Sequence, residues 1–412
     1  MTYKAWHGFC LCGEEDRFPP DAVPAEAPFC PLVFLVRRDG SVSRGIFAVS
    51  QLAEVYETEG IRCLCPCRAE APETVPPGLA ELVEKNGATV LNTSFSGGFS
   101  LLLHWTEKKK RGARITLVGL GDVGGTLLTG LILLGREIEE FAVYDPNAAL
   151  CARYEMELNQ ILPLEDRPTP KLRVIGEDAL FDCDLLVFTA SRGVPGLDSG
   201  ERDVRMAQWE ANRALIAPYA RRARQAGFQG IFCQVSDPVD LLAREVFLES
   251  NRSPGGELDC AGLLPEQIQG FGLGVMAARA EYYAGKEGIP FDNGRVYGPH
   301  GTGLLAANHW GKGYDPAISA RLTALARDAN LRVRELGFKP YIAPGLSSAA
   351  ISLVRMLRGQ TYYGSVPLGG VYFGCRSRRT RQGPAILREE LSPLLMARLK
   401  ETYRDLQGVD PS

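Results

Sequence analysis

Three glycines near position 120 have a spacing that lets a peptide loop approach a phosphate group closely. They follow the largely apolar stretch Arg114–Leu120 and precede the helix-like stretch Gly124–Gly135. In such a loop the first glycine permits a tight turn, the second admits a pyrophosphate, and the third lets helix and strand pack closely. The segment therefore predicts a dinucleotide-binding loop, with the candidate residues Gly119, Gly121, Asp122, Val123 and Gly124.

A carboxylate stands at the end of the next predicted strand. Asp145 directly follows Phe141–Tyr144. A carboxylate in this position accepts hydrogen bonds from the adenosine ribose and repels a 2′-phosphate, so it favours NAD over NADP. The alternative is a glycine-rich turn in an α/β protein that binds no nucleotide.

Cysteines are concentrated near the start of the chain. The chain has 11 cysteines, and Cys63, Cys65 and Cys67 alternate with other residues. If this stretch is extended, the three thiols share one face, and zinc takes four such ligands. Pro66 interrupts the stretch, and reduced structural thiols are the alternative. We assign no metal and keep these three cysteines as the candidates for one.

The composition is that of a globular protein. Of 412 residues, 45% are hydrophobic and 23% are charged, with a formal net charge of −3. The charge gives no reason to expect nucleic acid or an anionic membrane as a partner. The apolar run near Leu127–Leu134 is far shorter than the ~18 residues that span a bilayer. We expect a cytoplasmic protein without nucleic-acid or membrane partners.

The elements needed to position the glycine loop follow it in the sequence. Apolar strand-like and helical segments alternate, which predicts an α/β fold with a doubly wound parallel sheet. The expected segments are Arg114–Leu120, Gly124–Gly135, Phe141–Tyr144, Leu172–Ile175, Leu185–Thr189, Asp203–Ala226 and Gly230–Val235. The first hundred residues predict a small mixed α/β unit, in which Phe99–Trp105 is expected to be a strand. A charged linker at residues 107–112 separates the two parts.

Five segments in order resemble the lactate/malate dehydrogenase family over residues 112–408. They are the glycine loop, Asp184–Ser191 followed by Arg205 and Asn212, Val235–Asp240, Gly270–Arg279 and Gly298–Gly301. The resemblance implies a Rossmann domain followed by an α+β domain that binds substrate. The expected domains are a cysteine-rich unit of unknown role at 1–110, an NAD-binding domain at 111–260 and a substrate-binding domain at 261–412. The resemblance also implies a homodimer or homotetramer.

The same resemblance assigns chemical roles. In that family a hydride passes between the nicotinamide of NAD and a 2-hydroxy or 2-keto acid. His300 would move the proton, which suits an imidazole that titrates near pH ~6.5. Arg279 would grip the substrate carboxylate, and Arg205 would polarise its carbonyl group. Thr189, Ala190 and Ser191 would contact the cofactor.

Three positions depart from the family pattern. Met276 replaces the carboxylate that orients the catalytic histidine, and Asp237 replaces an asparagine that contacts the substrate. Asp237 could have become the carboxylate near His300, could bind a cationic group on the substrate, or could mark a degraded site. Asp198 lies in a lengthened specificity loop, where it would disfavour a dicarboxylate by like-charge repulsion; a solvated loop tip is the alternative.

These observations predict an NAD-dependent oxidoreductase for a small 2-hydroxy/2-keto acid other than ordinary lactate or malate. One alternative is an imine or amino-acid dehydrogenase on the same fold, which Asp237 and Asp198 favour. The other is an NAD-binding regulatory protein without efficient chemistry, which Met276 and the extra N-terminal unit favour.

Overall fold

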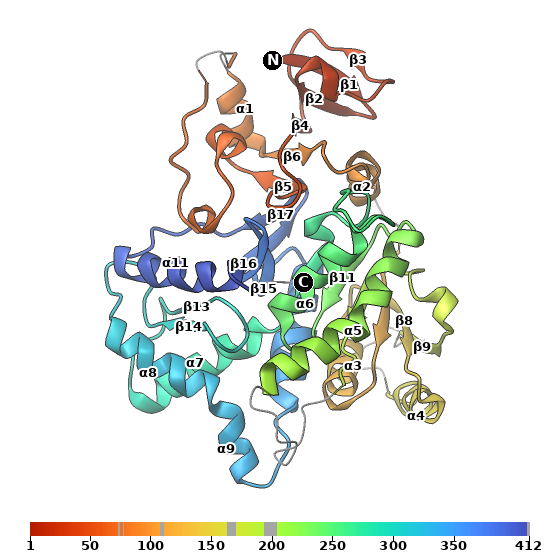
Figure 1. The fold of residues 1–412 in the computed structure, drawn as a ribbon, viewed down its shortest axis with the longest axis vertical. Coiled ribbons are helices and arrows are strands. Elements are labelled where there is room, and N and C mark those ends of the chain that lie inside the picture. Colours follow the sequence, from red (N-terminus) through yellow and green to blue (C-terminus); the bar gives the residue numbers. More distant parts are fainter. Residues whose placement is uncertain (73–74, 77, 108–110, 163–169, 193–203, 410–412) are drawn as a thin grey trace.

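A computed structural model describes residues 1–72, 75–76, 78–107, 111–162, 170–192 and 204–409. Predictions that concern the remaining positions, Asp198 among them, lie outside the described residues. Figure 1 shows the N-terminal strands gathered at the top of the view, above the body formed by the rest of the chain.

The described part of the N-terminal unit contains a mixed sheet. Its strand order is β3-β1-β2-β4-β6-β5. The bounds are β1 Thr2–Trp6, β2 Phe9–Gly13, β3 Val23–Pro24, β4 Leu32–Val36, β5 Ile46–Val49 and β6 Ala88–Asn92. Apolar side chains of β2, β4 and β6 are buried on both faces, because helix α1 covers one side and the body of the protein the other.

A larger sheet forms the centre of the body. Within the described ranges its order is β17-β16-β15-β12-β11-β10-β7-β8-β9. The bounds are β7 Ala113–Val118, β8 Ile138–Tyr144, β9 Lys171–Val174, β10 Leu185–Phe188, β11 Ile231–Gln234, β12 Ile268–Gly270, β15 Tyr362–Leu368, β16 Val371–Thr380 and β17 Gly383–Ile386. The strands from β9 to β12 pair in parallel, as a doubly wound sheet requires. The predicted α/β fold is confirmed.

Helices cover the faces of this sheet, and a small hairpin lies beside it. The helices are α1 Leu79–Asn86, α2 Gly98–Thr106, α3 Asp122–Leu134, α4 Ala148–Leu158, α5 Val204–Gln225, α6 Val239–Ser250, α7 Leu273–Glu287, α8 Pro316–Arg327, α9 Ala329–Glu335, α10 Ile351–Leu357 and α11 Pro393–Gln407. The hairpin pairs β13 Arg295–Tyr297 with β14 Leu305–Ala307. Between β7 and β12 the helices alternate with strands, and α3 and α6 bury apolar side chains against this sheet. Helix α1 instead covers the N-terminal sheet, and α9 buries only Ala329.

Two sequence-based expectations need comment. Phe99–Trp105 is not a strand but most of helix α2, since Leu101 and Leu102 turn to the core while other positions stay partly exposed. The strands β15–β17 extend the same sheet as β7–β12 in antiparallel pairing, so the division of the chain at 260 stays a prediction.

The N-terminal unit is held to the body by buried polar groups. The Glu266 carboxylate accepts hydrogen bonds from the backbone N–H groups of Gly45 and Ile46 at 2.9 and 3.0 Å. Thr89 donates to the Gln382 carbonyl at 2.8 Å. Glu266 is only 2% exposed, so its carboxylate needs these hydrogen-bond donors. The bonds therefore fix the position of the N-terminal unit on the body, in addition to the apolar packing between them.

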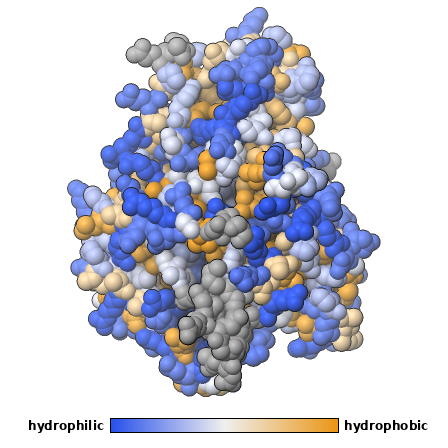
Figure 2. Space-filling model, viewed as in Figure 1, coloured by the Kyte–Doolittle hydropathy of each residue, from blue (hydrophilic) through white to orange (hydrophobic). Residues whose placement is uncertain are grey.

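The surface in view is largely hydrophilic. Figure 2 shows blue residues over most of this face, with small orange patches between them. Among the described residues, the model has no helix with the length and apolarity needed to cross a bilayer.

Stability should depend on the protonation of Glu266. Burial raises the pKa of Glu266 to about 7, although the two N–H groups and Arg44 oppose the rise. The folded form therefore binds this proton more tightly than the unfolded chain does, and the resulting stabilisation is lost as the pH rises through about 7. The free energy of unfolding of the wild type should fall between about pH 5 and about pH 8 by on the order of 2–3 kcal/mol more than that of Glu266→Gln does.

Urea denaturation at a series of pH values measures this difference. Glu14→Gln, at an exposed position, is the control and should follow the wild type. Parallel pH curves for the wild type and Glu266→Gln would contradict the assignment.

Candidate active site

The glycine loop is packed so closely that side chains are excluded at two positions. Gly119 follows β7 with φ +96°, and a Cβ there would lie 2.5 Å from the backbone nitrogen of Ala190. A Cβ on Gly124 would lie 2.1 Å from the carbonyl oxygen of Gly119. These contacts explain both glycines, because the loop, β10 and α3 meet here without space for a methyl group.

The middle glycine has the opposite property. No atom lies within 4 Å of a Cβ built on Gly121, so the backbone is open at that point. Helix α3 begins at the next residue, Asp122, and its free N–H groups face the same side. Lys339 places its ammonium 3.0 Å from the Asp122 carboxylate and offsets that negative charge. The result is an open stretch of backbone at a helix N-terminus.

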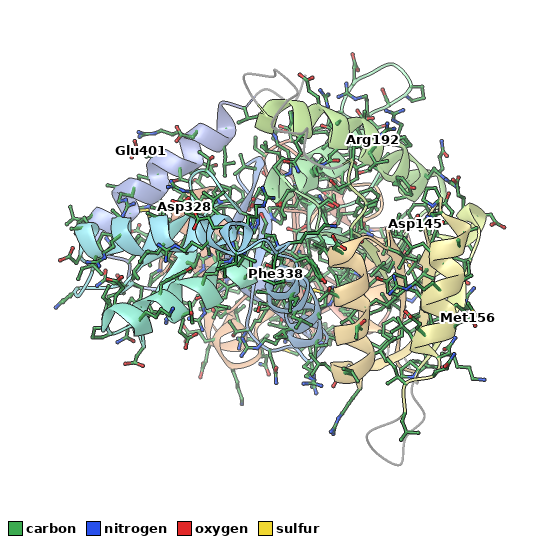
Figure 3. All side chains as sticks on the ribbon, turned by 90° about the horizontal axis from the view of Figure 1, so that it is seen from below. Asp145, Met156, Arg192, Asp328, Phe338 and Glu401 are labelled. Carbon is green, nitrogen blue, oxygen red and sulfur yellow. The ribbon has the colours of Figure 1, made fainter. Side chains whose placement is uncertain are left out.

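Asp145 lies at the carboxyl end of β8, where the sequence predicts it. One carboxylate oxygen accepts the Leu120 N–H at 2.8 Å, and the other accepts the Asn147 N–H at 2.8 Å. Each oxygen keeps a further lone pair for a hydroxyl donor. Asp145 thus ties the glycine loop to the next strand, and Figure 3 labels it on the side of the molecule where Arg192 is also found.

The residues that follow β10 reach the same loop. The Thr189 hydroxyl donates to the Gly119 carbonyl at 2.6 Å. The Ala190 carbonyl accepts from the Ser236 hydroxyl at 2.6 Å. Ser191 is 3.2 Å from the Asn212 side-chain nitrogen. The structure therefore brings together the candidate cofactor residues of the loop, of β8 and of β10.

Asn212 links this loop region to the next strand end. Its side chain, 1% exposed, accepts the Arg192 N–H at 2.8 Å and donates to the Asp237 carbonyl at 2.7 Å. Because the buried amide bonds to both backbone groups, it fixes the distance between the segments that contain Arg192 and Asp237. The sequence indicated Asn212 only as a marker of the resemblance, and its linking role comes from the structure.

His300 is held from two sides. Its ring nitrogen Nδ1 lies 2.8 Å from the Gly272 carbonyl, and its backbone N–H donates to Asp240 at 2.8 Å. Because a carbonyl only accepts, Nδ1 carries the hydrogen, and Nε2 is the acceptor nitrogen of the neutral ring. Glycine is required at 272, since a Cβ there would lie 2.8 Å from the His300 Cβ. The ring is thus oriented by a backbone carbonyl rather than by a carboxylate.

Asp240 supports His300 from the first turn of α6. It is 4% exposed and accepts a hydrogen bond of 2.5 Å from the Ser365 hydroxyl. Burial raises the pKa of Asp240 to about 6, although its hydrogen bonds from Ser365 and His300 oppose the rise. This acid was not among the sequence-predicted site residues.

Asp237 lies on the other side of the ring. Its Oδ1 atom is 3.6 Å from His300 Nε2, and its side chain is 51% exposed. The carboxylate therefore faces Nε2 and does not orient the ring through Nδ1. The expected proximity of Asp237 to His300 is present in this geometry, and its exposure also leaves it open to a cationic group.

Arg279 stands one helical turn after Met276 on α7. It donates to the Met276 sulfur at 3.8 Å and to the side-chain oxygen of Asn330 on α9. Burial lowers the pKa of Arg279, and Asp237 and Tyr283 oppose this effect. The arginine is a partly buried cation near Asp237 whose partners in these contacts are neutral, which suits it to receive an anion.

A cavity of about 400 Å³ joins these groups. Asp237, His300, Met276 and Asn330 line one part of it. The remainder is lined by side chains of α5, α6, α8 and α11, among them Gln208, Trp209, Leu241, Arg327, Thr402, Asp405 and Leu406. The cavity places the His300 imidazole beside a space for a small molecule, at the carboxyl ends of the parallel strands. Arg279 is not one of its lining residues, but it contacts two of them, Met276 and Asn330.

Two predicted site residues are not placed by the structure. Arg205 is in the first turn of α5, but its side chain is outside the described part, and Asp198 lies in an undescribed range. Gln208 and Trp209, one turn after Arg205, line the cavity.

The stretch that contains Cys63, Cys65 and Cys67 is not extended as a shared thiol face would require. Cys63 lies in a 3-10 turn, Ile61–Leu64, and is buried beside Arg44. Within the described ranges, no group of three or more His, Cys, Asp or Glu residues could hold a metal ion.

The comparisons with known proteins now decide the family. No family model matches the chain. L-lactate dehydrogenase 1 of Bacillus cereus is 30% identical over 264 residues, which cover 62% of this chain and 74% of that protein. The chain belongs to the lactate/malate dehydrogenase family.

Solved structures of the family share its fold. The minor L-lactate dehydrogenase of Enterococcus mundtii has a TM-score of 0.59 and 18% identity, and covers 72% of this chain and 96% of its own. Malate dehydrogenase of Archaeoglobus fulgidus, solved with NADH, has a TM-score of 0.58 and 18% identity, and covers 71% of this chain. More than a quarter of this family member thus has no counterpart in them.

The tight contact at Gly272 generates a prediction. In Gly272→Ala the new methyl group would collide with His300, so the ring and the start of α7 must shift. We expect a loss of roughly 1–3 kcal/mol in the free energy of unfolding. Gly285→Ala, on the same helix with no atom within 4 Å of its Cβ, is the matched control and should be neutral or stabilising. Urea denaturation of both variants checks this, and equal stabilities would refute the close packing.

Proposed function

We propose that this family member is an NAD-dependent dehydrogenase that interconverts a small 2-hydroxy acid and its 2-keto acid. The observation that carries the proposal is the position of His300, which lines a cavity while the Gly272 carbonyl holds its Nδ1. Arg279 lies behind Met276 and Asn330, two other lining residues. The reaction needs a proton exchanger and a carboxylate receptor close together, and we assign these roles to His300 and to Arg279 behind the cavity wall.

The glycine loop fits the dinucleotide. Gly121 leaves open backbone at the N-terminus of α3, where a pyrophosphate would be held by N–H groups. Asp145 keeps lone pairs for the ribose hydroxyls, and Thr189, Ala190 and Ser191 continue the same surface. When bound, NAD supplies or accepts the hydride at the substrate carbon. We propose NAD rather than NADP because Asp145 would repel a 2′-phosphate.

The chain's own residues would manage charge and protons. In the direction of reduction, His300 Nε2 donates a proton to the substrate oxygen, while Nδ1–H stays bonded to the Gly272 carbonyl. Arg279 binds the carboxylate in place of, or together with, its Asn330 contact. Arg205 is proposed to approach the carbonyl oxygen from α5 and to stabilise its developing charge.

We further propose that the substrate is neither lactate nor malate, because Met276 and Asp237 change the usual surroundings of the histidine. A homodimer or homotetramer is proposed as the assembly, and exposed apolar side chains such as Leu331, Leu336 and Phe338 support it. A cytoplasmic location is proposed on the strength of the 11 cysteines, all of which are free.

A second candidate is an imine or amino-acid dehydrogenase. Asp237 favours it, because a half-exposed carboxylate 3.6 Å from the proton-exchanging nitrogen could bind a substrate ammonium or iminium group. In that case turnover of a 2-keto acid would require an amine.

Oxidation of NADH measured with a set of 2-keto acids, with and without ammonium or methylamine, tests both candidates. We expect turnover without amine, and a fall of about 10²–10⁴-fold in kcat for His300→Gln with unchanged NADH affinity. His7→Gln, at an exposed histidine of the N-terminal unit, is the control and should retain full activity. Strictly amine-dependent turnover would favour the second candidate, and NADH binding without turnover of any acid would contradict both.

The cofactor proposal makes a separate prediction. In Gly121→Ala the added methyl group meets no protein atom, so folding should be preserved, but it would occupy the space of the pyrophosphate. We expect the Kd for NADH to rise at least about tenfold, or roughly 1.4 kcal/mol, without loss of thermal stability. Fluorescence titration with NADH measures it, and unchanged affinity in a folded variant would exclude this loop as the cofactor site.

A further inference from the structure

Arg379 is a partly buried cation without an anionic partner. It lies near the end of β16, and its guanidinium stands over the ring of Trp105 in α2, 4.1 Å from the ring centre. Among the described residues it forms no ion pair, and its side chain makes no hydrogen bond. Arg376, on the same strand, instead bonds to Glu389 at 3.0 Å.

The surroundings of Arg379 supply no compensating charge. Burial lowers the pKa of Arg379 to about 10, and the groups that oppose this effect are the Tyr362 hydroxyl and the Cys233 thiol. Both are neutral near pH 7, since burial raises the pKa of Tyr362 and the pKa of Cys233 well above their ordinary values. An arginine in this position lacks the carboxylate that usually accompanies a buried guanidinium.

A cavity of about 300 Å³ opens beside this guanidinium. It lies at the amino ends of the parallel strands, where Ala113, Leu185 and Ile231 begin β7, β10 and β11. The cavity described above lies at the carboxyl ends of the same strands, so the two are on opposite edges of the sheet.

Two of the acids that line this second cavity are paired with other arginines, one of which, Arg111, also lines the cavity. Asp184 pairs with Arg111 at 2.7 Å, and Glu137 pairs with Arg358 at 2.8 Å. Neither acid is among the groups that act on Arg379. Glu107 and His104 also line the cavity. The positive charge of Arg379 is therefore available to a ligand.

We propose that this cavity is a second binding site, for a small anion that carries a carboxylate or phosphate group. The planar guanidinium would hold two oxygens of the anion in a bidentate pair, and the Trp105 ring would form the adjacent wall. Trp105 comes from the N-terminal unit and Arg379 from the C-terminal strands, so an anion bound here links the two parts. The proposal is independent of the dehydrogenase activity.

Titration of the full chain with sodium phosphate and with sodium acetate, at matched ionic strength in sodium chloride, tests the site. We expect a saturable change in tryptophan fluorescence and a rise in Tm with at least one of the two anions. The anion with the lower Kd identifies the phosphate or the carboxylate as the preferred group. Arg379→Gln should abolish both responses, and Arg378→Gln, at the exposed neighbour on the opposite face of β16, should retain them.

A third variant covers the case in which Arg379→Gln does not fold. Arg379→Lys keeps the charge but loses the planar fork, so the Kd should rise at least about fivefold in a protein with a wild-type circular dichroism spectrum. The proposal is overturned if neither anion gives a saturable response, or if Arg379→Gln or Arg379→Lys binds as the wild type does.

Discussion

The hydrogen bond from the His300 ring to the Gly272 carbonyl is the constraint on which the candidate site depends. It requires a glycine at 272, a histidine whose backbone is fixed by Asp240, and the start of α7 at that point. A relative with a carboxylate at position 276 could orient the ring through charge. Here the dipole of the Gly272 carbonyl orients the ring through Nδ1, and the carboxylate of Asp237 faces Nε2.

The rest of the site follows from the edge of a parallel sheet. The strands β7, β10 and β11 end together, and hydrogen bonds from Thr189, Ser236 and Asn212 tie their loops to one another. Both the glycine loop and the segment before α6 are therefore positioned by one small set of buried bonds. A cofactor surface and a substrate cavity can share this edge because the loops are held at fixed spacing.

The parts predicted from the sequence were those with local causes. The glycine loop and Asp145 were predictable because their spacing reflects a turn, a close approach and a strand end. The Gly272 carbonyl and Asn330 were not, since a backbone acceptor has no residue type and Asn330 reaches Arg279 only through the packing of α9 on α7. The prediction of a strand at Phe99–Trp105 was wrong, because a short apolar run fits a buried strand and a buried helix equally well.

The bonds between Glu266 and the N-terminal unit have a consequence for biosynthesis. Gly45 and Glu266 are separated by 221 positions in the chain. At translation rates of ~5–20 residues per second, the first sheet would leave the ribosome roughly ten to forty seconds before its acceptor is made. β5 is an uncovered sheet edge for longer still, able to pair with other nascent chains until β17, which is made after Glu266, lies beside it. A chaperone that shields this strand would act early, on a polypeptide that still lacks most of its length.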